Sequence, residues 1–250
     1  MSNNLDHEVY DAHCHLSDEI CNLTTNTVTP PTAHRAVAAT SSHDWSKLVT
    51  YRQINPNAKI GFGIHPWNIE RDLPVDELDL QLRAQIEQQQ PDFIGETGLD
   101  MLKGNLNLQL EYLKIHLQLA QDFNLPIILH CVRAHNKLLE LLGKFPKLRG
   151  MIHAYNANSE TAMQYRRKNM QLGIGSIILT SNSQLAKSSA HLPLEQLLIE
   201  SDAPYMPMTG KQTSNSTDCL TYALELAMLQ QKNPSEVIAR VNQNWLNLFS

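Results

Sequence analysis

The segment Pro126-Ile127-Ile128-Leu129-His130 shows the unit from which the fold is built. Its run of apolar residues, which ends on a histidine, predicts a short buried β-strand. Apolar residues recur at helical spacing before it, in residues 106–123, and after it, in residues 138–145. A strand between two helices predicts a parallel sheet, because parallel neighbours are joined by a helical crossover.

Seven further apolar runs of the same kind predict seven more strands. They are Val9–His13, Ala36–Thr40, Lys59–Ile64, Phe93–Glu96, Arg149–His153, Gln171–Ser176 and Gln196–Glu200. The starts of the eight runs are roughly 22 to 34 residues apart, which is the size of a strand with its crossover helix. Eight such units in residues 1–250 predict a single α/β domain with the (β/α)8 fold of a TIM barrel.

Two details of this fold stay open. An open, doubly wound sheet shows the same alternation of strands and helices and is the alternative to a closed barrel. No G-x-G-x-x-G motif or P-loop follows any run, so a nucleotide-binding cradle is not expected. Residues 16–35 contain Pro30-Pro31 and no clear helical pattern, so we expect the first helix to be short or missing.

The composition is that of an ordinary globular protein. The 250 residues are 42% hydrophobic and 18% charged, with a formal net charge of −5. This charge predicts no broad basic surface for nucleic acid, and no apolar stretch approaches the ~18 residues that span a membrane. The four cysteines have no C-x-x-C spacing, so they predict neither a zinc finger nor disulfides. We expect a cytoplasmic protein without a membrane span or an obligate protein partner.

Histidine is unusually frequent, with 11 residues against 10 glycines. In Asp11-Ala12-His13-Cys14-His15, the alternation of side chains along a strand places His13 and His15 on the same face. Two imidazoles on one face can hold a metal ion. A pair of buried structural histidines would show the same spacing, so this motif alone does not decide between the two.

Four other predicted strands also end on, or just before, a residue that can bind metal. These residues are Glu96, His130, His153 and Asp202. In a parallel barrel the carboxyl ends of the strands meet at one rim, where the active sites of this fold lie. With His13 and His15 they make six nitrogen and oxygen ligands, which suit zinc, manganese or magnesium. Six ligands exceed the need of one tetrahedral ion and favour two divalent cations.

Motifs in the same order cover nearly the whole chain. They are Asp11-Ala12-His13-Cys14-His15-Leu16, Gly63-Ile64-His65-Pro66, Gly95-Glu96-Thr97-Gly98-Leu99-Asp100, Leu125-Pro126-Ile127-Ile128-Leu129-His130, Glu200-Ser201-Asp202-Ala203-Pro204-Tyr205 and Asn244-x-x-x-Leu248-Phe249. In these motifs the chain resembles the TatD family of metal-dependent hydrolases, a deoxyribonuclease-type branch of the amidohydrolase-like barrels. The resemblance implies the same six ligands in a binuclear centre. It also implies that Glu96 bridges the metals and that Asp202 is the base that accepts a proton from the nucleophilic water.

Further residues near the rim are interpreted through the resemblance. His65 is either a substrate contact or a structural histidine, and Arg133 is either a phosphate contact or a surface charge. Asp100 is expected to fix a loop rather than to bind metal. Where the family often has His-Cys-Phe-Ser-Gly, this chain has His153-Ala154-Tyr155-Asn156-Ala157, and His116 replaces a usual glutamine. We therefore expect altered substrate contacts around Tyr155-Asn156.

The leading hypothesis is hydrolysis of a phosphodiester, with DNA as the expected substrate, by a hydroxide held between two divalent cations. An amide, ester or lactone hydrolase on the same metal site is the alternative, because a shared fold does not decide which bond is cleaved. A barrel without catalytic activity is a third hypothesis, but such a protein would not be expected to keep all six ligands. No serine lies in a nucleophile elbow, which argues against a serine hydrolase.

Overall fold

The computed structural model describes residues 8–16 and 34–250, which contain one sheet of eight parallel strands. The strands pair in chain order, so each strand lies beside its neighbours in the sequence. Their bounds are β1 Asp11–His15, β2 Arg35–Ala38, β3 Lys59–Phe62, β4 Phe93–Asp100, β5 Ile127–Val132, β6 Gly150–Ile152, β7 Met170–Ile174 and β8 Leu197–Ile199. This order is that of the predicted (β/α)8 barrel, whereas a doubly wound sheet reverses direction partway.

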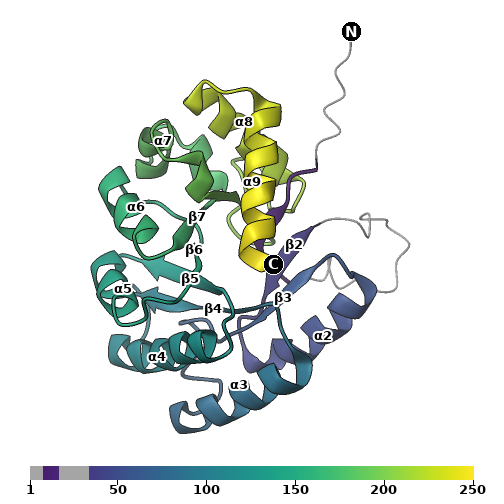
Figure 1. The fold of residues 1–250 in the computed structure, drawn as a ribbon, viewed down its shortest axis with the longest axis vertical. Coiled ribbons are helices and arrows are strands. Elements are labelled where there is room, and N and C mark those ends of the chain that lie inside the picture. Colours follow the sequence, from purple (N-terminus) through teal and green to yellow (C-terminus); the bar gives the residue numbers. More distant parts are fainter. Residues whose placement is uncertain (1–7, 17–33) are drawn as a thin grey trace.

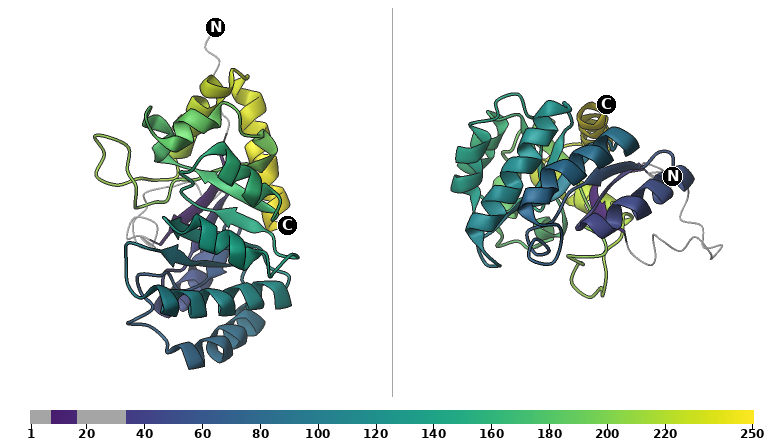
Figure 2. Two further views of the ribbon diagram at one scale, coloured as in Figure 1. Left: turned by 90° about the vertical axis from the view of Figure 1, so that its left-hand side faces the viewer. Right: turned by 90° about the horizontal axis from the view of Figure 1, so that it is seen from below.

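Helices follow the strands and cover the outside of the sheet (Figure 1). Within the described residues they are α2 Trp45–Ile54, α3 Val75–Gln89, α4 Leu106–Asp122, α5 His135–Leu142, α6 Ser159–Arg166, α7 Gln184–Ser189, α8 Asp218–Gln230 and α9 Pro234–Phe249. Helices α3 and α4 lie side by side, as do α8 and α9 (Figures 1 and 2). Across residues 8–16 and 34–250, no helix combines the length and the apolar character needed to cross a membrane.

Alternate strand residues divide the apolar core into an outer and an inner part. Ile94 and Leu129 belong to the large outer cluster that packs against the helices. Phe93 and Ile128, their neighbours in the chain, belong to the inner cluster inside the barrel. Because side chains alternate along a strand, a residue two positions after an inner apolar residue also faces the interior of the barrel.

Helix α9 closes the barrel at the end where the strands begin. The Trp245 indole N–H donates to the Asp11 carbonyl at the start of β1 (3.2 Å), and Phe249 packs on Phe93 at the start of β4. The Asn244 side chain donates to two backbone carbonyls beside the start of β8. Because apolar side chains fill this end, the opposite end is the one left for a functional site.

Hydrogen bonds beyond the regular sheet pairing hold β1 beside the end of β8. The Asp202 N–H donates to the His13 carbonyl (2.9 Å). The buried Asp11 carboxylate accepts hydrogen bonds from the Ser201 N–H (2.9 Å) and the Ser201 hydroxyl (2.6 Å). These bonds place Asp202 next to the histidines of β1, although the two come from opposite ends of the chain.

The eight predicted strands are confirmed, and the differences lie mainly at their boundaries. Strand β4 continues to Asp100, four residues beyond Glu96, because residues 97–100 pair with residues 129–132 of β5. Helix α2 has no clear signal in the sequence, because only three of its ten residues are buried and its apolar pattern is weak. The expected short or missing first helix falls in residues 16–35, of which 17–33 lie outside the described residues.

Candidate metal centre

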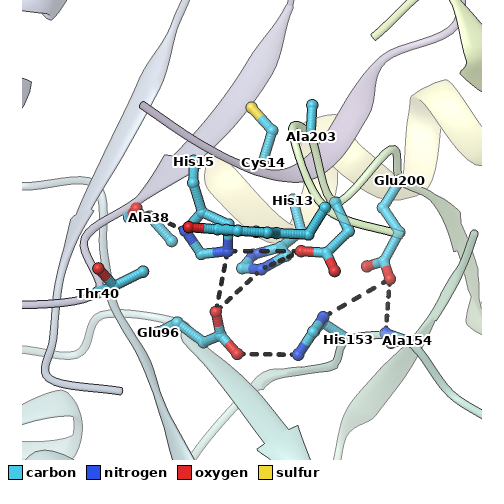
Figure 3. Close-up of polar contacts among 12 residues, drawn as sticks. His13, Cys14, His15, Ala38, Thr40, Glu96, His153, Ala154, Glu200 and Ala203 are labelled. Carbon is cyan, nitrogen blue, oxygen red and sulfur yellow. Dashed lines mark hydrogen bonds and ion pairs between the residues drawn. The ribbon is translucent and has the colours of Figure 1, made fainter. Parts of the chain in front are cut away.

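The six predicted ligands meet in the barrel, at the end opposite α9, and all are buried. Figure 3 shows four of them, His13, His15, Glu96 and His153. They are His13 and His15 of β1, Glu96 of β4, His130 of β5, His153 directly after β6, and Asp202 after β8. Strand alternation explains the inward direction of two of them. Ile128 and Met151 lie in the inner cluster, so His130 and His153, each two residues later, face the interior too.

Glu96 Oε2 faces the first group of ligands, which consists of His13, His15 and Asp202. This oxygen is 3.2 Å from His13 Nε2 and 3.1 Å from His15 Nε2 (Figure 3). Asp202 Oδ1 is 3.4 Å from each of the same two nitrogens. His15 Nδ1 lies 3.1 Å from the Ala38 carbonyl, to which it donates, so Nε2 is the nitrogen available to a cation.

Glu96 Oε1 faces the second group of ligands, His130 and His153. It is 2.8 Å from His153 Nε2 and 3.1 Å from His130 Nδ1, and these two nitrogens are 3.0 Å apart. His130 Nε2 instead lies 3.5 Å from an Asp100 oxygen, so Nδ1 is the candidate ligand atom. The two oxygens of Glu96 therefore face different groups, as the oxygens of a carboxylate shared by two cations would.

Opposite charges gather in this cluster away from water. Burial disfavours the ionised form of Glu96, but the charges of His153 and other nearby histidines outweigh it and hold the Glu96 pKa well below its usual range. Burial also disfavours the charged form of His15, but hydrogen bonds to Asp202 and Glu96 raise the pKa of His15 to about 9. Groups that hold protons this strongly also attract metal cations, which would replace those protons.

Unpaired buried atoms support a cation at this place. In the part of the chain that the structure describes, no hydrogen bond of normal geometry reaches the buried atoms His13 Nε2, Glu96 Oε1 and Asp202 Oδ1, although groups of opposite charge lie 2.8–3.4 Å away. Each buried polar atom that stays unsatisfied reduces the stability of the folded protein by about 1–3 kcal/mol. Three sets of ligand atoms lie within 4.8 Å of one another: His13–His15–Asp202, His13–Glu96–His153 and His65–Glu96–His130. Imidazole nitrogens and carboxylate oxygens are the donors that zinc and related divalent cations take.

The structure brings His65 to the same cluster. Its Nε2 is 3.4 Å from Glu96 Oε1, and its Nδ1 accepts a hydrogen bond from the Trp67 backbone N–H (3.2 Å). Burial lowers the pKa of His65, which favours the neutral ring. A neutral ring with Nδ1 as acceptor carries its proton on Nε2, on the side that faces Glu96. His65 is therefore arranged as a hydrogen-bond donor toward the site.

His116 of α4 supports the segment that precedes His65. Its Nδ1 donates to the Tyr112 carbonyl (2.7 Å), and its Nε2 accepts from the Ile64 N–H (3.2 Å). Burial lowers the pKa of His116 to about 4, so the ring is neutral and can accept this bond. Histidine, like the glutamine usual at this place, offers one donor and one acceptor, so the substitution leaves the ligand cluster intact.

A cavity of about 590 Å³ opens at the cluster and contains several of the predicted contact residues. Arg133 lines it directly after β5 and is exposed. Asp100 accepts a hydrogen bond from the Trp67 indole (2.7 Å), in keeping with a role in fixing a loop. In the altered segment after His153, Asn156 lines the cavity, whereas Tyr155 is buried in the core. Of these two, only Asn156 is placed to contact a substrate.

Glu200 is a residue of this region that sequence analysis misses. It is 0% exposed, its Oε1 accepts the Ala154 N–H (2.5 Å), and the same oxygen is 3.8 Å from His153 Nδ1 (Figure 3). Burial raises the pKa of Glu200 to about 8. Gly173 of β7 leaves room for it, since a Cβ there would be 2.0 Å from Glu200 Oε2. The available signal was spacing, because Glu200 follows the inner residue Leu198 by two positions.

We expect Glu200→Ala to weaken zinc binding about 10- to 100-fold, because an acidic group behind a ligand histidine orients the ring and makes it more basic. Gly173→Ala is expected to weaken zinc binding too, because its methyl group would displace the Glu200 carboxyl group. Competition with a zinc-binding dye measures both affinities. Glu195→Ala, which removes an exposed glutamate just before β8, is the control. Wild-type affinity in both test variants would contradict this role.

Comparisons with known proteins agree with this fold. A sequence model of the family described as TatD related DNase matches residues 10–250. The uncharacterised metal-dependent hydrolase YjjV of Escherichia coli is 26% identical over 220 residues, which cover 86% of this chain and 85% of the relative. The uncharacterised metal-dependent hydrolase MJ1582 of Methanocaldococcus jannaschii is 26% identical over 244 residues, or 96% of each chain.

Solved structures show the same similarity in three dimensions. The crystal structure of YjjV, described as a TatD homologue, matches with a TM-score of 0.86 and covers 97% of this chain and 98% of that one. A TatD family hydrolase from Entamoeba histolytica, 18% identical, shares the fold with a TM-score of 0.77 over 97% of this chain and 98% of its own.

Proposed function

This chain is a metal-dependent hydrolase of the TatD related DNase family, and we propose that the bond it cleaves is the phosphodiester bond of DNA. The observation that carries this proposal is the position of Glu96, whose two oxygens face two separate groups of ligands. When bound there, two divalent cations (zinc, magnesium or manganese) would lower the pKa of the attacking water and offset the charge on the phosphoryl oxygens.

The six buried residues would hold the cations in two adjoining sites that share Glu96. His13, His15 and Asp202 would serve one site, and His130 and His153 the other. The donors in both sites are imidazole nitrogens and carboxylate oxygens, with no thiolate among them. The distances between these atoms support this division, since each oxygen of Glu96 is within 3.2 Å of a nitrogen from its own group.

Asp202 is the proposed general base. Burial disfavours its ionised form, but hydrogen bonds from His13 and His15 outweigh it and hold the pKa of Asp202 below its usual range. The carboxylate is therefore ionised at neutral pH, as a general base must be. Asp202 also lines the cavity, where a substrate phosphate and the attacking water would meet. We propose that the water transfers its proton to this carboxylate as its oxygen bonds to phosphorus. The P–O bond to one sugar oxygen breaks in the same step, and that leaving oxygen takes up a proton from solvent.

His65 and Arg133 are the proposed substrate contacts. The proton on His65 Nε2 faces the ligand cluster, which suits donation to a phosphoryl oxygen better than metal binding. Arg133 lies exposed on the cavity wall, where its guanidinium could pair with a phosphate in two parallel hydrogen bonds. Both residues would act on the charged backbone of the substrate rather than on its sequence.

The test removes metal with a chelator and then restores zinc, manganese or magnesium singly. The substrates are labelled single-stranded and duplex DNA, together with an ester, an amide and a lactone. We expect no DNA cleavage after chelation and cleavage after at least one cation is restored. Absence of DNA cleavage with every cation would overturn the proposal. Hydrolysis of only the ester, amide or lactone would assign the same metal site to the alternative class.

A further inference from the structure

We propose that Trp67 and Tyr205 stack on the bases that flank the cleaved phosphodiester, an inference that rests on the proposed cleavage of DNA. Both side chains line the cavity that contains the ligand cluster. Both are also largely exposed, Trp67 at 58% and Tyr205 at 57%. Two large aromatic rings exposed at the mouth of one cavity indicate a surface for binding flat, apolar groups.

The two rings lie beside different groups of metal ligands. The Tyr205 ring is 5.5 Å from the ring of His15, which belongs to the first group. The Trp67 ring is 5.3 Å from the His65 ring and 6.4 Å from the ring of His130, which belongs to the second group. A phosphodiester seated between the two groups would have one nucleoside on the side of each ring. This placement predicts one stacked base on each side of the cleaved bond.

Hydrogen bonds hold Trp67 by its indole N–H and Tyr205 by its backbone, and none of these bonds involves a ring face. The Trp67 indole N–H donates to the buried carboxylate of Asp100 (2.7 Å). The Tyr205 N–H donates to the Asp202 carbonyl (2.7 Å), and the Tyr205 carbonyl accepts a hydrogen bond from the Ser214 hydroxyl. These bonds fix the indole edge and the tyrosine backbone. Less conformational entropy is then lost when a base stacks on the rings.

Positive charge accompanies the rings, which favours nucleic acid over an apolar peptide or a lipid. The Lys103 ammonium is 5.2 Å from the centre of a Trp67 ring, and Arg133 lines the same cavity. Aromatic side chains beside cations are typical of surfaces that bind single-stranded nucleic acid, where the rings stack on bases and the cations pair with phosphates. Bases can stack in this way only when they are unpaired.

The test compares oligothymidylate with an oligomer of equal length that carries the same phosphates but no bases. For Trp67→Ala and Tyr205→Ala we expect the KM for oligothymidylate to rise between about fivefold and a hundredfold, with little change in kcat. Neither variant should change the KM for the abasic oligomer. Trp67→Phe and Tyr205→Phe should keep most of the wild-type affinity, and Leu102→Ala, which shortens an exposed side chain nearby, is the control.

A binding measurement separates this inference from the proposed function. The chain has three tryptophans, of which Trp45 and Trp245 are buried, so a stacked base should quench mainly Trp67. We expect oligothymidylate, but not the abasic oligomer, to quench the fluorescence of the zinc-loaded wild type, and Trp67→Phe to abolish that quenching. Equal binding of the two oligomers would overturn the stacking inference. Selective binding without cleavage under any cation would overturn the proposed DNase activity and leave the stacking result standing.

Discussion

Glu96→Gln is expected to reduce the metal-dependent activity about 10²- to 10⁴-fold. Loss of a group that only hydrogen-bonds to a metal ligand already costs 10- to 100-fold in metal affinity, and loss of a ligand costs at least as much. Glu96 faces both groups of ligands, so its replacement would weaken both proposed cation sites, and the two losses would multiply. The amide of glutamine keeps the shape of the side chain but lacks the negative charge, and its nitrogen cannot bind a cation or accept from a histidine.

The experiment measures bound metal and hydrolysis on the same samples. Metal content after gel filtration, determined by mass spectrometry, should fall toward zero for Glu96→Gln. Circular dichroism should show a fold like that of the wild type, since the substitution preserves volume in the buried site. Glu195→Gln makes the same chemical change at an exposed position and should leave both readouts unchanged. Two retained cations with a wild-type rate would show that Glu96 does not bridge them.

Regular strand geometry explains why much of the candidate site is predictable from sequence. Ile128 and His130 are two positions apart on β5, so burial of the first inside the barrel implies an inward direction for the second. Because parallel strands end at one rim, separate strand ends such as His130 and Glu96 can be brought together without knowledge of any loop. The convergence of the strand ends follows from these two regularities. The inward direction of Glu96 does not, because Glu96 lies two positions after the outer residue Ile94 and depends on an irregularity of β4 between Ile94 and Thr97.

Residues beyond the regular strands are less predictable. Strand β8 ends at Ile199, and Asp202 has a φ of +53°, so the chain turns between them and simple alternation no longer applies. Glu200 still follows the alternation of β8, because it lies two positions after the inner residue Leu198, whereas the position of Asp202 depends on the turn. Trp67 lies in the segment between β3 and α3, where no periodic pattern indicates the direction of a side chain.

Zinc affinity is expected to rise between about 10² and 10⁴-fold from pH 6 to pH 8, because protons must leave the histidines before a cation binds. The pKa of His15 is raised to about 9 by Asp202 and Glu96, despite burial, and that of His13 is raised well above its usual value. Both rings therefore carry a proton across this range when no cation is bound. Each proton released on binding changes the affinity tenfold per pH unit. Over the two units from pH 6 to pH 8, release of one proton raises the affinity 10²-fold and release of two protons raises it 10⁴-fold.

A zinc affinity that rises with pH identifies the groups that lose protons when the cation binds. Glu96 and Asp202 have lowered pKa values and are already ionised at pH 6, so they release no protons in this range. Burial lowers the pKa of His153, so this ring holds its proton less strongly than a free histidine does. The rise in affinity with pH must then come chiefly from His13 and His15, the histidines whose pKa values are raised most.

Competition with a chelator of known affinity at pH 6, 7 and 8 measures this dependence. Calorimetry in two buffers of different ionisation enthalpy counts the released protons directly. His15→Asn, whose amide does not titrate, should bind zinc more weakly and release about one proton fewer than the wild type. An affinity that stays constant from pH 6 to pH 8 would mean that the cations do not displace protons from these histidines, and the assignment of His13 and His15 as ligands would fail with it.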